Sequence, residues 1–229
     1  MDPNSCLCIL SLTDGPKRSG PRRLPRSLYL IIWLLRQLQL FSTSIDDLLM
    51  ARSGRHFCLA IGAKLWSRLS HGQKSWLASA NIKPVIVAKP SDFDRLAQLN
   101  IAELKGLDCR VALIPETTTK LTDVAAGKQE QLLMQGRQWL VKNFPHQPHG
   151  FFYPQGAYDT SVLNYLREFH FDFGLTCHRG FNQPGCDPLQ LKHIPLKLGL
   201  ARILLAVARQ TIVRSLRPNP KPAKAVRTN

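Results

Sequence analysis

The residues best placed to do chemistry form the loop Tyr153-Pro154-Gln155-Gly156-Ala157-Tyr158, which follows a short apolar run. Proline fixes one backbone angle and glycine tolerates angles closed to other residues, so Pro154 and Gly156 can turn the chain sharply at a strand end. Such a turn exposes backbone polar groups and the Tyr158 ring to a cleft, where loops commonly bind ligands. We therefore expect a binding site at Tyr153, Pro154, Gly156, Tyr158 and Asp159.

A regular alternation of segments must position this loop. Apolar or β-branched runs predict strands at 56–62, 83–88, 109–114, 150–153 and 171–177. Helical patterns cover 66–80, 91–104, 125–144 and 160–169, with Ser91 and Asp159 as candidate N-caps. Strands that alternate with helices indicate an α/β fold with a mostly parallel sheet or barrel, and ligand sites at the carboxyl ends of the strands.

The two ends of the chain differ from this regular middle. Residues 1–55 read as an irregular basic extension and residues 56–199 as the α/β domain. Residues 200–217 have the spacing of a basic amphipathic helix, and the Pro- and Lys-rich residues 218–229 are expected to be a disordered tail. The apolar run at 28–35 is too short to cross a bilayer, and no small-residue cleavage site of a signal peptide follows it, so localisation is left open.

The chain has a formal net charge of +16, which favours negatively charged partners. A surplus of this size attracts anionic lipids, phosphate backbones or acidic polysaccharides, and the basic helix predicted at 200–217 could meet an anionic membrane surface. The middle of the chain lacks the interleaved aromatic and basic residues of RNA-binding sheets and the Cys/His spacing of zinc fingers, which disfavours nucleic acid as the partner.

The segment from Phe151 to Thr176 resembles a conserved block of the polysaccharide deacetylase (NodB-homology) family. That block is a strand, a Tyr-Pro-x-Gly-x-Tyr loop, a helix and a second strand, and the wider resemblance covers roughly Phe57 to Leu196. It implies a deformed (β/α) barrel of the polysaccharide deacetylase type with basic N- and C-terminal extensions. It also implies a polysaccharide or glycan substrate.

The residues that hold the catalytic metal in this family are largely replaced. The stretch Glu116-Thr117-Thr118-Thr119-Lys120 stands where the family has a His-Thr-x-x-His motif. Glu116 could still ligate a divalent cation such as zinc, but Lys120 places an ammonium beside it and is the expected ion-pair partner of Glu116. The cofactor prediction is therefore either none or a divalent metal.

Three segments could correspond to the family's first block, a strand that ends in two catalytic aspartates. Asp14, in Ser11-Leu12-Thr13-Asp14-Gly15, matches the local pattern best and keeps one aspartate. Asp46 and Asp47 keep both but leave too little chain for the helix that should follow. The strand end at Leu59 to Ala63 has the favoured spacing and keeps neither.

His193, in Leu191-Lys192-His193, matches the family's Leu-x-His element, which supplies the general acid. The same histidine also fits the basic residue that often ends the closing strand of such domains. Asp14 and His193 are thus the candidate catalytic pair.

Three functions follow from these observations. The first is a diverged deacetylase-like protein with a retained carbohydrate cleft and doubtful activity. The second is an active metal-dependent deacetylase, a hydrolase of the carbon–nitrogen bonds of N-acetylated sugars, which would use Asp14 or the Asp46 and Asp47 pair with His193. The third is a basic adaptor that binds anionic membrane or nucleic acid through its ends.

Overall fold

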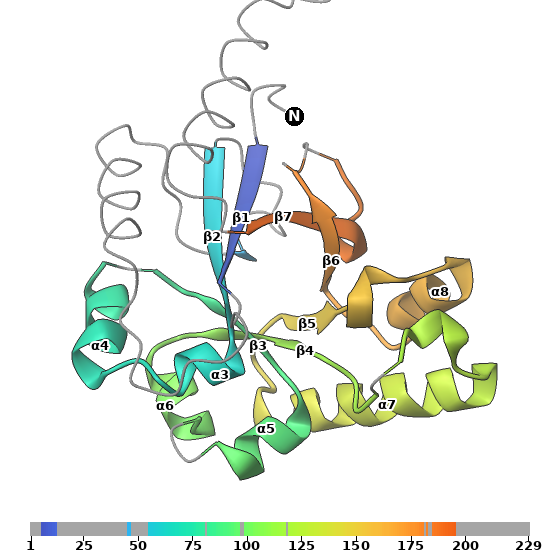
Figure 1. The fold of residues 1–229 in the computed structure, drawn as a ribbon, viewed down its shortest axis with the longest axis horizontal. Coiled ribbons are helices and arrows are strands. Elements are labelled where there is room, and N and C mark those ends of the chain that lie inside the picture. Colours follow the sequence, from blue (N-terminus) through green and yellow to red (C-terminus); the bar gives the residue numbers. More distant parts are fainter. Residues whose placement is uncertain are drawn as a thin grey trace, which may run out of the picture.

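The computed structural model describes residues 6–12, 45–46, 55–80, 82–96, 99–117, 119–180, 182 and 185–195. In this part of the chain, seven parallel strands form a closed barrel, each paired with the next in sequence, and β7 pairs back with β1 (Figure 1). The strands are β1 (Cys6–Leu12), β2 (Arg55–Gly62), β3 (Val85–Ala88), β4 (Arg110–Leu113), β5 (His149–Phe152), β6 (Phe173–Arg179) and β7 (Leu191–Pro195). The expected deformed (β/α) barrel with parallel strands is confirmed.

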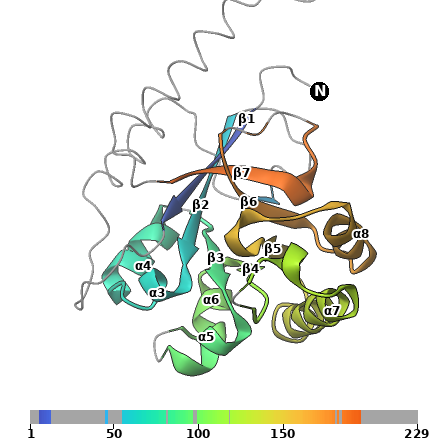
Figure 2. The same ribbon diagram turned by 45° about the vertical axis from the view of Figure 1, so that its right-hand side comes forward.

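The described helices lie on the outside of the barrel, beside the strands from β2 to β6 (Figures 1 and 2). They are α3 (Ala63–Trp66), α4 (His71–Ser79), α5 (Pro90–Arg95), α6 (Ile101–Gly106), α7 (Ala126–Asn143) and α8 (Thr160–Glu168). Short 3₁₀ turns lie at η1 (Leu121–Asp123), η2 (Pro154–Gly156) and η3 (Pro188–Gln190). Consecutive parallel strands need a crossover connection, and helices provide it between every consecutive strand pair from β2 to β6.

Alternate residues of the strands enter two separate cores, because successive strand side chains point to opposite faces. One core fills the barrel interior and contains Ala60, Val85, Ala112, Phe173 and Leu175. The other lies between the strands and the helices and takes residues of the opposite parity, among them Ile61, Ile86, Val111, Phe151 and Tyr153. Strand parity therefore decides which side chains can reach a site inside the barrel.

Three sequence predictions differ from the structure. The segment Cys6–Leu12, expected within an irregular extension, is a barrel strand that pairs with β2 and β7. The single helix expected at 66–80 is two helices, because the Ser70 side chain accepts a hydrogen bond from Gln73 N and starts a new helix after α3. The helix expected at 91–104 is also two helices. The first begins at Pro90, so Ser91 is not its N-cap, and Asn100 caps the second.

Several predictions fall on parts of the chain that the structure does not describe. The basic helix expected at 200–217 and the tail at 218–229 lie outside the described residues, so binding to an anionic membrane stays a prediction. Within the described ranges, no helix is both long and apolar enough to span a membrane.

Candidate functional site

A cavity of about 600 Å³ opens at the carboxyl ends of the strands. Gly62 ends β2, Lys89 follows β3, Glu116 follows β4 and Phe152 ends β5, and all four line the cavity. This is the edge where (β/α) barrels place their ligand sites, because the strand-to-helix loops converge there. The volume falls in the range of about 300–1,000 Å³ that is typical of small-molecule sites.

The inner part of the cavity lies among residues of the barrel interior. Ala60, Val87, Phe152 and Leu175 all line it, and all belong to the interior core or pack against it. His193 lies two residues after Leu191, a buried member of the same core, and also lines the cavity. The inner part is thus an apolar wall with one imidazole.

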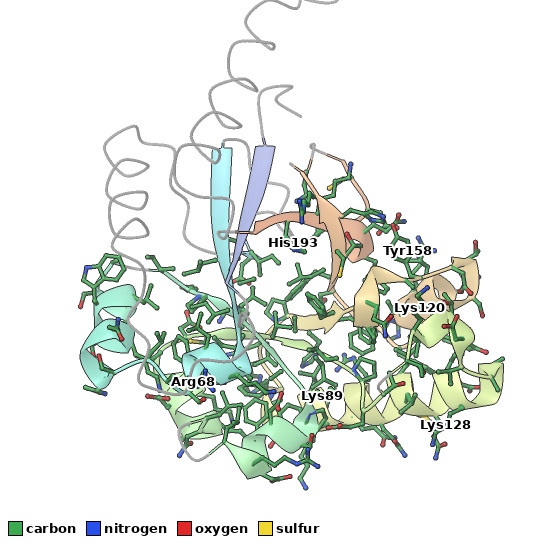
Figure 3. All side chains as sticks on the ribbon, viewed as in Figure 1. Arg68, Lys89, Lys120, Lys128, Tyr158 and His193 are labelled. Carbon is green, nitrogen blue, oxygen red and sulfur yellow. The ribbon has the colours of Figure 1, made fainter. Side chains whose placement is uncertain are left out.

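A backbone contact determines which ring nitrogen of His193 (labelled in Figure 3) carries the proton. Its Nδ1 lies 2.7 Å from the Thr176 carbonyl oxygen, which can only accept, so Nδ1 carries the proton. Burial lowers the pKa of the imidazole below its ordinary value, and Arg179 acts in the same direction. A neutral ring with Nδ1 bonded to the backbone leaves Nε2 as a hydrogen-bond acceptor for a ligand.

Polar and charged residues also line the cavity, and contacts between two loops hold some of them in place. The Lys89 ammonium lies 3.2 Å from the Thr117 carbonyl oxygen, to which it donates. In the opposite direction, the Glu116 carboxylate accepts a hydrogen bond of 2.8 Å from Ser91 N. The loops after β3 and β4 are therefore bound to each other at the cavity mouth.

Glu116 does not have the partner predicted from the sequence. Its hydrogen bond is to Ser91 N, and within the described ranges no ion pair joins it to Lys120. The short contact with α5 holds the Glu116 carboxylate instead, because the first N–H groups of a helix have no partner inside the helix.

Tyr153 lies on the helix side of the barrel. It has the parity of Phe151, is 0% exposed and packs against that ring, with centroids 5.1 Å apart. Its hydroxyl donates to the Leu189 carbonyl at 2.6 Å. Strand parity turns the Tyr153 side chain away from the cavity and gives it a packing contact. The binding role expected for Tyr153 stays a prediction.

The rest of the Tyr153–Tyr158 loop forms the sharp turn expected from the sequence. Pro154 is buried, Gln155 and Gly156 have positive φ angles of 54° and 72°, and Gly156 packs against Cys177. The half-buried Tyr158 donates to Gln190 Oε1 at 3.2 Å. Asp159 caps α8 as expected, since its Oδ1 accepts from Val162 N at 2.9 Å.

The acidic candidates from the N-terminal region lie in different places. Asp14 and Asp47 are outside the described residues, although β1 ends at Leu12, two positions before Asp14. Asp46 binds Arg110, the first residue of β4, through Arg110 Nε at 3.1 Å. Since Arg110 starts its strand, Asp46 lies at the amino end of the barrel, opposite the cavity, and a catalytic role with His193 is incompatible with this position.

Comparisons with known proteins were made for sequence and for structure. No family model and no curated protein matches this sequence. The Streptococcus pyogenes deacetylase PplD, solved with acetate, aligns with a TM-score of 0.69 at 11% identity, over 88% of this chain and 96% of that one. The chain has the fold of the polysaccharide deacetylases.

Two further solved structures have the same fold. A polysaccharide deacetylase from Bacillus cereus aligns with a TM-score of 0.63 at 13% identity, over 89% of this chain and 68% of that one. A de-N-acetylase from Aggregatibacter actinomycetemcomitans aligns with a TM-score of 0.59 at 12% identity, over 88% and 98%. At these identities the similarity concerns the fold.

The metal implied by the polysaccharide deacetylase fold does not fit the described residues at this edge. A zinc-like ion needs several neutral imidazole or carboxylate ligands around one point. Among the described residues, no group of three histidine, cysteine, aspartate or glutamate side chains could hold one. The Glu116 carboxylate is bound to Ser91 N, and Lys89 adds an ammonium to the same cavity.

Lys64, Lys89, Arg95 and Phe152 line the cavity but belong to no motif that the sequence shows. The signal was present, since Lys89 and Phe152 stand at predicted strand ends, where a barrel places its site. Apolar strand residues and surface lysines are common, however, and only the closed barrel brings these together.

Proposed function

We propose that this chain is a deacetylase-like carbohydrate protein that binds an N-acetylated glycan in the cavity at the carboxyl edge of the barrel, without metal-dependent hydrolysis. One observation carries the proposal: the cavity combines the apolar wall of Ala60, Phe152 and Leu175 with the imidazole of His193. Sugar rings have apolar faces and polar edges, and sites of this mixed character suit them.

The neutral His193 ring supplies the polar contact of the inner part. Its Nε2 accepts a hydrogen bond from a sugar hydroxyl or from the N–H of an acetamido group, while Nδ1 stays on Thr176. Phe152 offers part of its side chain to the apolar face of a ring, since it is only half-buried. Metal-independent binding is supported by the poor fit of the described histidine, cysteine and acidic side chains to a metal ion.

The test is calorimetric titration of the protein with the tetrasaccharide of chitin, in the presence of EDTA and again with added zinc. Binding should be the same in both, and His193→Gln should weaken it about tenfold, the loss expected for one hydrogen bond. His146→Gln, which changes an exposed histidine in a turn, is the matched control. Absence of binding in both conditions, or binding that needs the metal, contradicts the proposal.

A second candidate function is an active deacetylase in which Asp14 and His193 act together. The observation that favours it is the pairing of β1 with β7, which sets Leu10 opposite Ile194 and brings the segment before Asp14 next to the strand of His193. Acetate release from the same tetrasaccharide, stimulated by zinc, nickel or cobalt and lost in Asp14→Asn, would establish this function and exclude the first.

A further inference from the structure

The mouth of the cavity has more positive than negative side chains. Lys64, Lys89 and Arg95 line it, against Asp92 and Glu116. They come from three neighbouring places: Lys64 is in α3 just after β2, Lys89 follows β3, and Arg95 ends α5. The carboxyl ends of two adjacent strands thus contribute the ammonium groups.

Both carboxylates already have backbone partners. Asp92 Oδ2 accepts from Lys89 N at 2.9 Å, and Glu116 Oε1 accepts from Ser91 N at 2.8 Å. These contacts start helix α5 and join it to the loop after β4. The two acids are therefore held by the chain in fixed positions.

The cationic side chains have fewer hydrogen-bond partners than the carboxylates. The side chains of Lys64 and Arg95 are exposed and, within the described part of the chain, make no hydrogen bond or ion pair. An ammonium has three donors, and Lys89 uses one on the Thr117 carbonyl. Lys89 is also half-buried, where a charge is screened less than on the open surface.

We infer that the glycan bound in this cavity carries an acidic group, and that Lys89, with Lys64 and Arg95 around it, binds this group at the mouth while an N-acetylated sugar lies on the inner wall near His193. The inference rests on the proposed function and specifies its ligand. The physical reason is that donors left over at a half-buried ammonium favour an anionic acceptor, since charge-assisted hydrogen bonds are the strong ones.

Three oligosaccharides of equal length test this. The hyaluronan tetrasaccharide alternates N-acetylglucosamine with a uronic acid, its carboxyl-reduced form has the same sugars without the charge, and the chitin tetrasaccharide is neutral and fully N-acetylated. Calorimetry on the full chain at low salt should show that the acidic tetrasaccharide binds at least about tenfold more tightly than its carboxyl-reduced form. High salt should reduce this preference.

Variants locate the preference within the molecule. Lys89→Met keeps the aliphatic stem and removes the ammonium, so the preference for the acidic form should fall about tenfold. Lys64→Ala and Arg95→Ala remove cations that have no partner in the described structure, so both should fold normally and still lower the preference. The matched control is Lys128→Met, which removes an exposed ammonium on α7, well apart from Lys89 (Figure 3). All variants share the same basic chain ends, so attraction by those ends cancels.

The outcomes separate this inference from the proposed function. If none of the three oligosaccharides binds, the proposed function fails. If the acidic and reduced forms bind equally, or if Lys128→Met lowers the preference as much as Lys89→Met, a neutral glycan site remains and the inference is overturned. A preference that depends on Lys89, Lys64 and Arg95 alone supports it.

Discussion

His193 Nδ1 donates a hydrogen bond to the Thr176 carbonyl oxygen across 2.7 Å, which joins β7 to β6. This contact fixes one tautomer and one ring orientation at the inner end of the cavity. The side chain that the sequence offered as a general acid is thereby held by the backbone, and its second nitrogen is the one that can meet a ligand.

Acidification should destabilise the protein through His193 and His149. Burial lowers the pKa of both imidazoles below the ordinary value of 6.5. As the pH falls through about 6.5, the histidines of the unfolded chain take up protons before those of the folded protein do. The free energy of unfolding should therefore decrease from about pH 6.5 down to the lowered pKa values of the folded protein. At higher pH these two groups should have no effect on it. Urea denaturation at a series of pH values between neutral and mildly acidic measures this slope.

The slope should become flatter in His193→Gln and in His149→Gln, whatever each change does to stability at neutral pH. The Asp108 and Asp187 carboxyls have partners in the folded protein, and their pKa values are lowered. They therefore titrate at a lower pH than the range in which the two histidines act. An unchanged slope in both histidine variants would contradict the assignment.

Gly156→Ala should lower the free energy of unfolding by about 2–5 kcal/mol. The residue has a φ of 72°, a region that costs other residues about 1–2 kcal/mol, and a Cβ would lie 2.4 Å from Cys177 Cβ, which adds about 1–3 kcal/mol of overpacking. Gly185→Ala is the control. Its φ is 77°, but nothing lies within 4 Å of the added Cβ, so only the backbone cost should be measured in urea. Equal losses would refute the role of the Cys177 contact.

Tyr153→Phe should lower the free energy of unfolding by about 1–2 kcal/mol, because the buried Leu189 carbonyl loses its donor. Glycan affinity should stay the same, since Tyr153 faces the helices. Tyr158→Phe breaks a half-buried contact with Gln190 and should cost under about 0.5 kcal/mol. Denaturation and calorimetry on the same two variants check both statements. Loss of glycan binding in Tyr153→Phe would restore the binding role expected from the sequence.

Asp46→Asn should destabilise the fold without changing ligand binding. The Asp46 carboxylate accepts hydrogen bonds from Arg110, whose side chain is 9% exposed, and loss of the charge should cost about 1–3 kcal/mol. The exposed Asp123, changed to Asn, is the control and should stay within about 0.5 kcal/mol of the parent. Weaker glycan binding in Asp46→Asn with unchanged stability would contradict this prediction and indicate that Asp46 takes part in ligand binding.

The periodicity of the sequence determined the α/β class, most strand positions from β2 to β6 and the cap of α8 by Asp159. These features depend on neighbours a few residues apart, so a linear pattern contains them. The break between α3 and α4 was missed, since apolar spacing continues through a segment that Ser70 and Gln73 divide by a capping box.

Tertiary structure alone decided which side chains share the site. Phe152 reaches the cavity and Tyr153 does not, because neighbouring residues of a strand point to opposite faces of the sheet. Only the closure of the barrel decides which face is the interior. Likewise, Asp46 and His193 look equally suited to chemistry in the sequence, but the parallel direction of the strands sets them at opposite ends. The sequence determined which residue types were present, and barrel closure determined that Lys89, Glu116 and His193 line one cavity.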